Sequence, residues 1–266
     1  MAVRPHRRLA CAVLAIAAVT AGAAARAAEV QVAVAANFAD PAKEIAADFE
    51  RSTGAHVALS IGASGQFYAQ IAHGAPFEVF LSADAERPKR AEAEGFAVPG
   101  TRFTYAIGRL VLYSRSSGLV DNGGEVLKRG GFDKLAIADP AAAPYGAAAV
   151  QTMTRMGLYD RLKPRIVQGA SIGQAYGFVE SGAASLGFVA LLQVIDVKGG
   201  SRWLVPQVLY DPIEQDAVLL KPGEGDPAAR AFLNYLKGPQ AQAVIRRYGY
   251  GTRQSLSHSR WNKANG

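Results

Sequence analysis

Four short segments of the sequence combine small, polar and glycine residues where a helix is predicted to begin. They are residues 35–38 (AANF), 62–65 (GASG), 139–146 (DPAAAPYG) and 169–172 (GASI). A helix start offers main-chain N–H groups that have no intrahelical acceptor, at the positive end of the helix dipole. Several starts brought together would bind an anion without lysine or arginine. For each segment alone, ordinary helix capping is the alternative, because serine and asparagine are common N-caps.

The elements that would position these segments alternate between apolar runs and amphipathic stretches. In the first half, strands are predicted at 30–36, 56–61 and 77–82, and helices from Pro41 and over 64–73 and 83–94. This βαβαβα order favours a parallel sheet with helices on both faces. After a β-rich stretch at 103–114 the alternation resumes, with strands at 135–138 and 185–189, helices at 144–156, 172–181, 227–236 and 240–248, and extended segments at 203–209 and 217–220.

Two α/β units in about 220 residues predict two lobes, each a mostly parallel sheet flanked by helices. Sheets of this kind bind ligands beyond the carboxyl ends of their strands. All four segments follow predicted strands, so they are the places where a ligand is expected.

The net charge is concentrated at the two ends of the chain. The sequence has 29 Lys and Arg against 22 Asp and Glu, a net charge of +7, and a pI near 9.6. Four of the basic residues lie in 1–27 and three in 251–266, and neither segment contains an acidic residue. The body of the chain, residues 28–250, therefore has 22 Lys and Arg against 22 Asp and Glu. A basic groove for nucleic acid is therefore not indicated.

Residues 1–27 have the layout of a secretory signal peptide. A basic start is followed by an apolar run from Leu9 to Ala25 and by Ala25-Arg26-Ala27, which predicts a mature N-terminus at Ala28. A transmembrane anchor is the alternative, but the run is short for a span of about 20 apolar residues. The single cysteine, Cys11, lies in this segment. A disulfide framework and a multi-thiolate metal site are thereby excluded, and the polar tail 251–266 is predicted to be disordered.

Six stretches in a fixed order carry a resemblance to a known family. They are 32–38 (VAVAANF), 60–71 (SIGASGQFYAQI), 74–84 (GAPFEVFLSAD), 135–140 (LAIADP), 179–189 (VESGAASLGFV) and 235–250 (YLKGPQAQAVIRRYGY). Over about residues 29–250 the sequence resembles the periplasmic molybdate-binding proteins of bacterial ABC transporters. The resemblance implies a type II periplasmic-binding-protein fold, in which a two-segment hinge joins two lobes around one oxyanion. Lobe 1 would comprise 28–105 and 213–250, and lobe 2 would comprise 106–212.

Carried over by position, the resemblance implies one ligand residue from each of the four segments. Asn37 and Ser64 would bind through side chains, and Tyr145 and Ile172 through main-chain N–H groups, with the Tyr145 hydroxyl as an additional donor. A tyrosine that some members have after the LGFV-like strand is Ala190 here. The implied ligand is molybdate or tungstate, with no cofactor. The implied partners are the transporter's membrane permease and ATPase, and the chain is expected to be a periplasmic monomer.

Other classes of protein have weaker support in the sequence. No Gly-x-Ser-x-Gly elbow surrounds Ser64, and His73 is interpreted as a surface or capping residue, so a hydrolase is not indicated. A ferric-ion binder would need paired tyrosines, whereas Tyr105, Tyr113, Tyr145, Tyr159 and Tyr176 are spread along the chain. A carrier for another tetrahedral anion such as sulfate remains the alternative, in which Arg109 and Asp139 are further candidate ligands.

Overall fold

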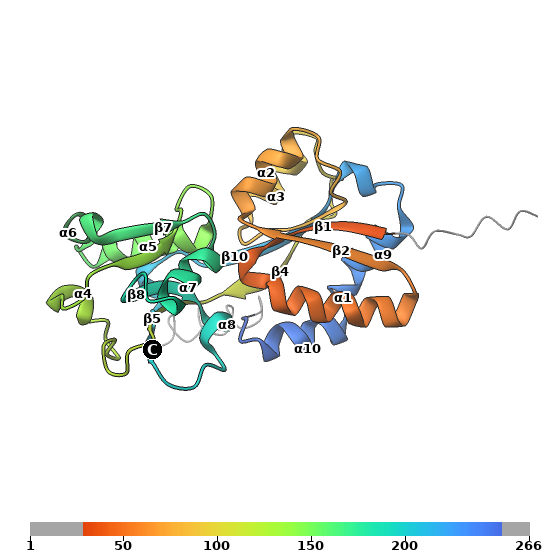
Figure 1. Ribbon diagram of the computed structural model, residues 1–266. Helices are drawn as coiled ribbons and strands as arrows, with labels where there is room; N and C mark the ends of the chain where they lie inside the picture. Colours follow the sequence, from red (N-terminus) through yellow and green to blue (C-terminus); the bar gives the residue numbers. More distant parts are fainter. Residues whose placement is uncertain (1–28, 252–266) are drawn as a thin grey trace, which may run out of the picture.

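The computed structural model describes residues 29–251, and these form two α/β lobes lying side by side (Figure 1). Each lobe contains one five-stranded sheet, with strand orders β2-β1-β3-β10-β4 and β7-β6-β8-β5-β9. The predicted signal peptide, and the predicted tail after Gly251, lie outside the described residues. Within the described residues, no helix is long and apolar enough to cross a membrane.

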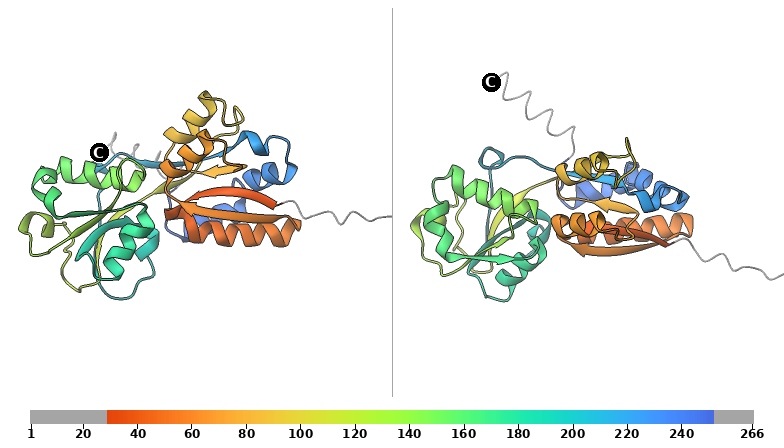
Figure 2. Two further views of the ribbon diagram at one scale, coloured as in Figure 1. Left: turned by 45° about the horizontal axis from the view of Figure 1, so that its top comes forward. Right: turned by 90° about the horizontal axis from the view of Figure 1, so that it is seen from above.

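Lobe 1 is built from β1, β2, β3, β4 and β10, with helices on both faces of the sheet (Figure 2). Alternate residues of β1 face opposite sides: Val32 packs in the cluster with α1, α9 and α10, whereas Ala33 packs with α2 and α3. The elements are β1 (Glu29–Ala35), η1 (Ala36–Phe38), α1 (Ala39–Thr53), β2 (His56–Gly62), α2 (Ser64–Ala72), β3 (Val79–Leu81), α3 (Glu86–Ala93), β4 (Phe103–Gly108), β10 (Ile213–Leu219), η4 (Lys221–Gly223), α9 (Pro227–Tyr235) and α10 (Pro239–Arg247).

Lobe 2 repeats the same layered arrangement. Ile137 of β6 packs with α5 on one face, and Ala136 packs with α7 and α8 on the other. The elements are β5 (Leu110–Ser114), α4 (Val126–Arg129), β6 (Leu135–Ala138), α5 (Pro144–Arg155), α6 (Tyr159–Leu162), η2 (Lys163–Arg165), β7 (Ile166–Gly169), α7 (Ile172–Glu180), β8 (Leu186–Ala190), α8 (Leu191–Val194), β9 (Ser201–Leu204) and η3 (Gln207–Leu209).

The chain passes between the sheets twice. It leaves the first sheet after Gly108, three residues beyond the expected boundary at 105, because β4 stays paired with β10 up to the Gly108–Ile213 register position. It returns between Tyr210 and Ile213, next to the expected boundary at 212. The main-chain N–H of Leu110 donates to the Tyr210 hydroxyl at 3.2 Å, so the two crossing segments are tied together.

The predicted two-lobed α/β architecture is confirmed, but the sheets are mixed rather than mostly parallel. In each sheet two strand pairings are parallel and two are antiparallel, since β10 and β5 run against their neighbours. The extended segment predicted at 203–209 is a strand only to Leu204. Pro206, which cannot donate to a sheet ladder, comes two residues later and precedes the 3₁₀ turn η3.

Candidate oxyanion-binding site

A small cavity between the lobes is lined by the starts of four helices. In this closed arrangement the cavity is narrow and partly open to solvent. η1, which runs directly into α1, and α2 approach from lobe 1, and α5 and α7 approach from lobe 2. Of the described residues that line the cavity none carries a charged side chain; they are Ala35, Ala36, Asn37, Gly62, Ala63, Ser64, Ala83, Ala143, Pro144, Tyr145 and Ile172.

Sheet topology brings the four starts together. β1 and β2 are parallel neighbours, so Ala35 and Gly62 at their carboxyl ends are register partners. β6 and β7 are related in the same way through Ala138 and Gly169. Each of these strands leads directly or after a short turn into one of the four helices. Two equivalent sheet edges therefore face each other across the cavity, as expected for ligand binding at the carboxyl ends of parallel strands.

The electrostatics of these helix starts favour an anion. The first turns of η1, α2, α5 and α7 contain no acidic residue, and Asp40 follows only in α1, beyond η1. A carboxylate in the first turn would interact with the helix dipole and repel a bound anion. Its absence leaves the positive ends of the dipoles directed at the cavity.

Ser64 is held in a donor orientation at the first residue of α2. The side chain is 1% exposed, and its Oγ accepts the main-chain N–H of Ala83 at 2.9 Å. Because an oxygen that accepts this bond must turn its own hydrogen elsewhere, the hydroxyl hydrogen remains for a ligand in the cavity.

Asn37 lines the cavity, but its side-chain amide is engaged in the protein. The Nδ2 group donates to Gln215 Oε1 at 2.9 Å and to the Tyr250 hydroxyl at 3.0 Å, and that hydroxyl donates back to the Asn37 carbonyl at 2.6 Å. Both amide hydrogens are therefore used. The main-chain N–H groups in the first turn of η1 are the donors that this residue and Ala36 can offer.

Tyr145 and Ile172 lie at the starts of the two helices from lobe 2. Both are buried, at 1% and 3% exposure. The Tyr145 hydroxyl accepts from Gln215 Nε2 at 3.2 Å, so it is directed at the crossing segments and its main-chain N–H is the group left for the cavity. The Ile172 carbonyl accepts from Gln193 Nε2 at 3.3 Å, which fixes the turn that presents the Ile172 N–H.

The two lobes are in contact beside the cavity. The main-chain N–H of Gly65 donates to the carbonyl of Ala142 at 2.8 Å. Arg87 of α3 is paired with Asp84 in its own lobe and donates across the junction to the carbonyl of Ala141 at 2.7 Å. These contacts show that the lobes are closed over the site.

Behind the cavity lie three buried tyrosines: the Tyr105 and Tyr145 hydroxyls bond to Gln215, and the Tyr250 hydroxyl bonds to Asn37. Gln215 is not among the residues predicted from the sequence. Burial raises the pKa of Tyr105, Tyr145 and Tyr250 well above that of an exposed tyrosine. Their hydroxyls therefore stay protonated at physiological pH. Tyr105 and Tyr145 are core residues, and although they are far apart in the sequence, β10 brings Gln215 between them. Gln215 is 0% exposed although it lies between Glu214 and Asp216 in β10, so its burial shows only in the structure.

The remaining candidates lie elsewhere. Arg109 is exposed at the crossing between lobes, and neither it nor Asp139 lines the cavity. Ala190, the last residue of β8, is buried and is not in the lining. The interpretation of His73 as a surface or capping residue is confirmed, because its exposed ring lies 2.7 Å from the Ala69 carbonyl at the end of α2. Among the described residues, no three His, Cys, Asp or Glu side chains gather into a metal site.

Two lobes closed over a small, uncharged, donor-rich cavity define a ligand-binding protein. A family model for bacterial extracellular solute-binding proteins matches residues 30–251, so the chain belongs to this family. The molybdate-binding protein ModA of Rhodobacter capsulatus is 58% identical over 228 residues, 86% of this chain and 90% of that protein. ModA of Azotobacter vinelandii is 57% identical over 231 residues, 86% of this chain and 92% of that protein.

A solved structure gives the same result. The periplasmic molybdate-binding protein of Azotobacter vinelandii superposes with a TM-score of 0.81 at 46% identity, covering 84% of this chain and 99% of that one. The resemblance to the periplasmic molybdate-binding proteins is thereby confirmed.

Proposed function

We propose that this protein captures molybdate or tungstate between its lobes and delivers it to the permease and ATPase of an ABC transporter. The observation that supports this proposal most directly is the cavity itself. Four helix starts meet there, none has an acidic residue in its first turn, and no charged side chain of residues 29–251 lines the cavity. The relatives named molybdate-binding proteins support the choice of anion.

The donor set suits a fully deprotonated tetrahedral dianion. Molybdate offers oxygens that only accept hydrogen bonds, and the Ser64 hydroxyl and the main-chain N–H groups at Asn37, Tyr145 and Ile172 only need to donate. A protonated oxyanion would bring a hydrogen that needs an acceptor, so phosphate is disfavoured. Bonds from neutral donors to a charged acceptor are stronger than neutral pairs. They also avoid a buried counter-charge, which would be costly in the empty protein.

Cavity size is the proposed means of discrimination from sulfate. Sulfate has the same charge and the same acceptor pattern, so the donors alone do not separate the two anions. It is smaller than molybdate, and donors held by two lobes at a fixed separation would contact it less well. Tungstate is close to molybdate in size and is expected to bind in the same way.

Titration calorimetry of the purified protein with molybdate, tungstate, sulfate and phosphate tests the proposal. We expect molybdate and tungstate to bind at one site per chain, and sulfate at least about 100-fold more weakly, a difference of about 2.7 kcal/mol. Sulfate binding as tightly as molybdate would favour the alternative of a sulfate carrier. Absence of binding by all four anions would reject the oxyanion proposal.

The cellular setting forms part of the same proposal. Residues 1–27 would direct export to the periplasm and be removed before Ala28. The mature chain would act there as a monomer that needs no cofactor and catalyses no reaction. Mass spectrometry of the exported protein would test the cleavage site, and light scattering would test the monomer.

A further inference from the structure

One buried amide, that of Gln215, connects the two halves of the site. Its Oε1 accepts from Asn37 Nδ2 at 2.9 Å and from the Tyr105 hydroxyl at 3.1 Å, both in lobe 1. Its Nε2 donates to the Tyr145 hydroxyl at 3.2 Å, from lobe 2. Gln215 therefore bonds to one cavity-lining residue of each lobe, although it does not line the cavity.

A bulge between β4 and β10 makes this arrangement possible. Gln215 is opposite Ala106 and Asp216 is opposite Thr104, so Tyr105 is the additional residue of β4. A bulge redirects the side chains around it, and here the Tyr105 hydroxyl and the Gln215 amide meet.

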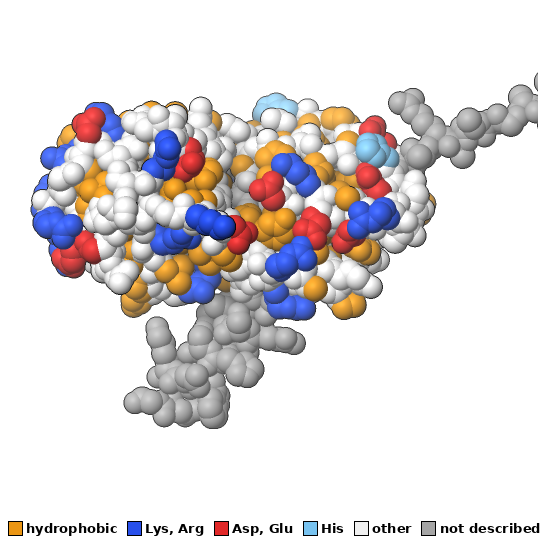
Figure 3. All heavy atoms as spheres, turned by 60° about the horizontal axis from the view of Figure 1, so that its bottom comes forward, with side chains coloured by type: hydrophobic (Ala, Val, Ile, Leu, Met, Phe, Trp, Pro, Cys, Tyr) orange, Lys and Arg blue, Asp and Glu red, His pale blue; other side chains and the backbone are white. Residues whose placement is uncertain are grey.

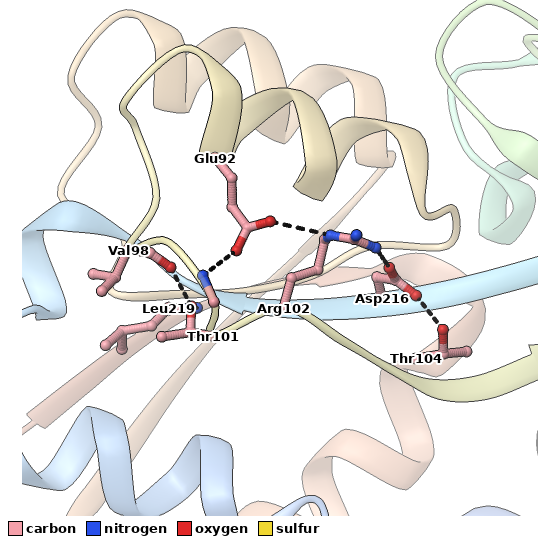
Figure 4. Close-up of polar contacts among 8 residues, drawn as sticks. Glu92, Val98, Thr101, Arg102, Thr104, Asp216 and Leu219 are labelled. Atoms are coloured by element: carbon pink, nitrogen blue, oxygen red, sulfur yellow. Dashed lines mark hydrogen bonds and ion pairs between the residues drawn. The ribbon is translucent and has the colours of Figure 1, made fainter.

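Asp216, the next residue of β10, is held by several polar contacts. The Asp216 carboxylate is 0% exposed, pairs with Arg102 and accepts from Thr104 Oγ1 at 2.6 Å, while Arg102 also pairs with Glu92 of α3 (Figure 4). These bonds hold β10 at the bulge, and with it the backbone that carries Gln215.

Gly108, where the chain leaves the first sheet, leaves room for the contact between Tyr145 and Gln215. A Cβ atom at Gly108 would lie 2.3 Å from the Tyr145 hydroxyl oxygen and 2.7 Å from Gln215 Nε2. Both separations are shorter than any van der Waals contact. The absence of a side chain at Gly108 therefore allows the Tyr145 phenol to pack against the point where the chain passes between lobes.

We propose that Gln215 is a positioning residue that sets the width of the anion site and thereby its selectivity for the larger anion. The amide connects Asn37 to Tyr145 through two hydrogen bonds, so it fixes the separation between the starts of η1 and α5. Without this connection, the lobes could close further around a smaller ion. The inference rests on the proposed function, because it concerns the same site.

The experiment replaces Gln215 by Met, which keeps the length of the side chain and removes its hydrogen bonds. The readout is the ratio of the sulfate Kd to the molybdate Kd, with sulfate measured by competition against molybdate. We expect this ratio to fall about tenfold, because selectivity is a difference of affinities that depends on the spacing. If the substitution only destabilised the protein, the binding of both anions would weaken together and the ratio of the two Kd values would stay unchanged. That result would overturn the inference.

A second variant keeps the test valid if Gln215→Met does not fold. Tyr145→Phe removes the hydroxyl that Gln215 bonds and leaves the main-chain N–H at the cavity. We expect the same fall in the ratio and, in a double-mutant cycle, little further change when both substitutions are combined. Tyr113→Phe is the control, because Tyr113 is equally buried, in lobe 2, and does not line the cavity. An unchanged ratio in Tyr145→Phe would also overturn the inference.

The wild-type protein separates the two possible failures. If it binds none of the anions, the proposed function is wrong. If it prefers molybdate to sulfate and both variants retain the wild-type ratio, only the role of Gln215 is wrong.

Discussion

The main-chain N–H of Gly65 and the carbonyl of Ala142 meet at 2.8 Å across the junction of the two lobes. Gly65 is the second residue of α2, and Ala142 lies just before α5. A Cβ atom at Gly65 would be 2.9 Å from the Ala142 Cα and 3.0 Å from its carbonyl oxygen. Closure of the lobes therefore requires glycine at this position.

Gly65→Ala is expected to weaken molybdate binding at least about tenfold, or 1.4 kcal/mol, because the added methyl group prevents full closure. The same substitution should not lower the melting temperature of the unliganded protein, since alanine is favoured over glycine in a helix by about 1 kcal/mol. Calorimetry and thermal denaturation measure the two effects. Gly177→Ala is the control, because Gly177 is in α7 with no atom within 4 Å of its Cβ position. Unchanged affinity in Gly65→Ala would contradict the closure requirement.

Ser64→Ala should lower molybdate affinity about 10- to 100-fold, because a hydrogen bond to a charged group contributes about 1.5–3 kcal/mol. It should also reduce stability, since the Ala83 N–H loses its acceptor. Ser82→Ala is the matched control: its buried hydroxyl also accepts a main-chain N–H, that of Asp84, but it does not line the cavity. If both variants bound molybdate as the wild type does, Ser64 would not be a ligand.

Molybdate affinity should be constant between about pH 7 and 9, because the pKa of Tyr105, Tyr145 and Tyr250 is raised by burial and exposed tyrosines titrate near 10. The folded state favours the neutral phenol, so this contribution to stability is fully present below about pH 10 and is lost as the pH rises toward the folded-state pKa. Calorimetry across this range and melting curves up to pH 11 test both statements. A steep fall in molybdate affinity between pH 7 and 9 would argue against neutral phenols at these three tyrosines.

Asp216→Ala should destabilise the protein by about 2 kcal/mol, because Arg102 and Thr104 both lose their buried acceptor while Arg102 keeps its pair with Glu92. For a protein of this size the melting temperature would fall by about 4–8 °C. Lys128→Ala provides the comparison, since the Lys128–Glu125 pair is more than half exposed and such pairs contribute about 1 kcal/mol or less. Equal effects of the two substitutions would show that Asp216 is not an anchor of the bulge.

The charged side chains of both signs are interspersed, as expected for a body whose net charge is zero. On the face shown in Figure 3, acidic and basic side chains lie next to each other over both lobes. Ion pairs of the described residues, such as Arg155–Asp211 and Arg247–Glu44, likewise join opposite charges. Binding of a small anion is thus supported by local dipoles in a neutral body, not by an overall field.

Local patterns in the sequence were sufficient to predict most elements that carry the site. The predicted helix starts near Ser64, Pro144 and Ile172 coincide with those of α2, α5 and α7, because each follows a strand and a small-residue turn. The direction of β10 and its bulge were not predictable, because antiparallel pairing with β3 and β4 depends on contacts more than 100 residues apart. For the same reason the engagement of the Asn37 amide by Gln215 and Tyr250 could not be inferred.

The equal division of the cavity between the lobes has a consequence for unloading. Two helix starts come from each lobe, so a rotation that separates the lobes removes half of the donors in a single movement. No side chain has to lose or gain a proton, and no competing ion has to enter. Release would then be a mechanical event, driven by whatever pulls the lobes apart and insensitive to the acidity of the surroundings.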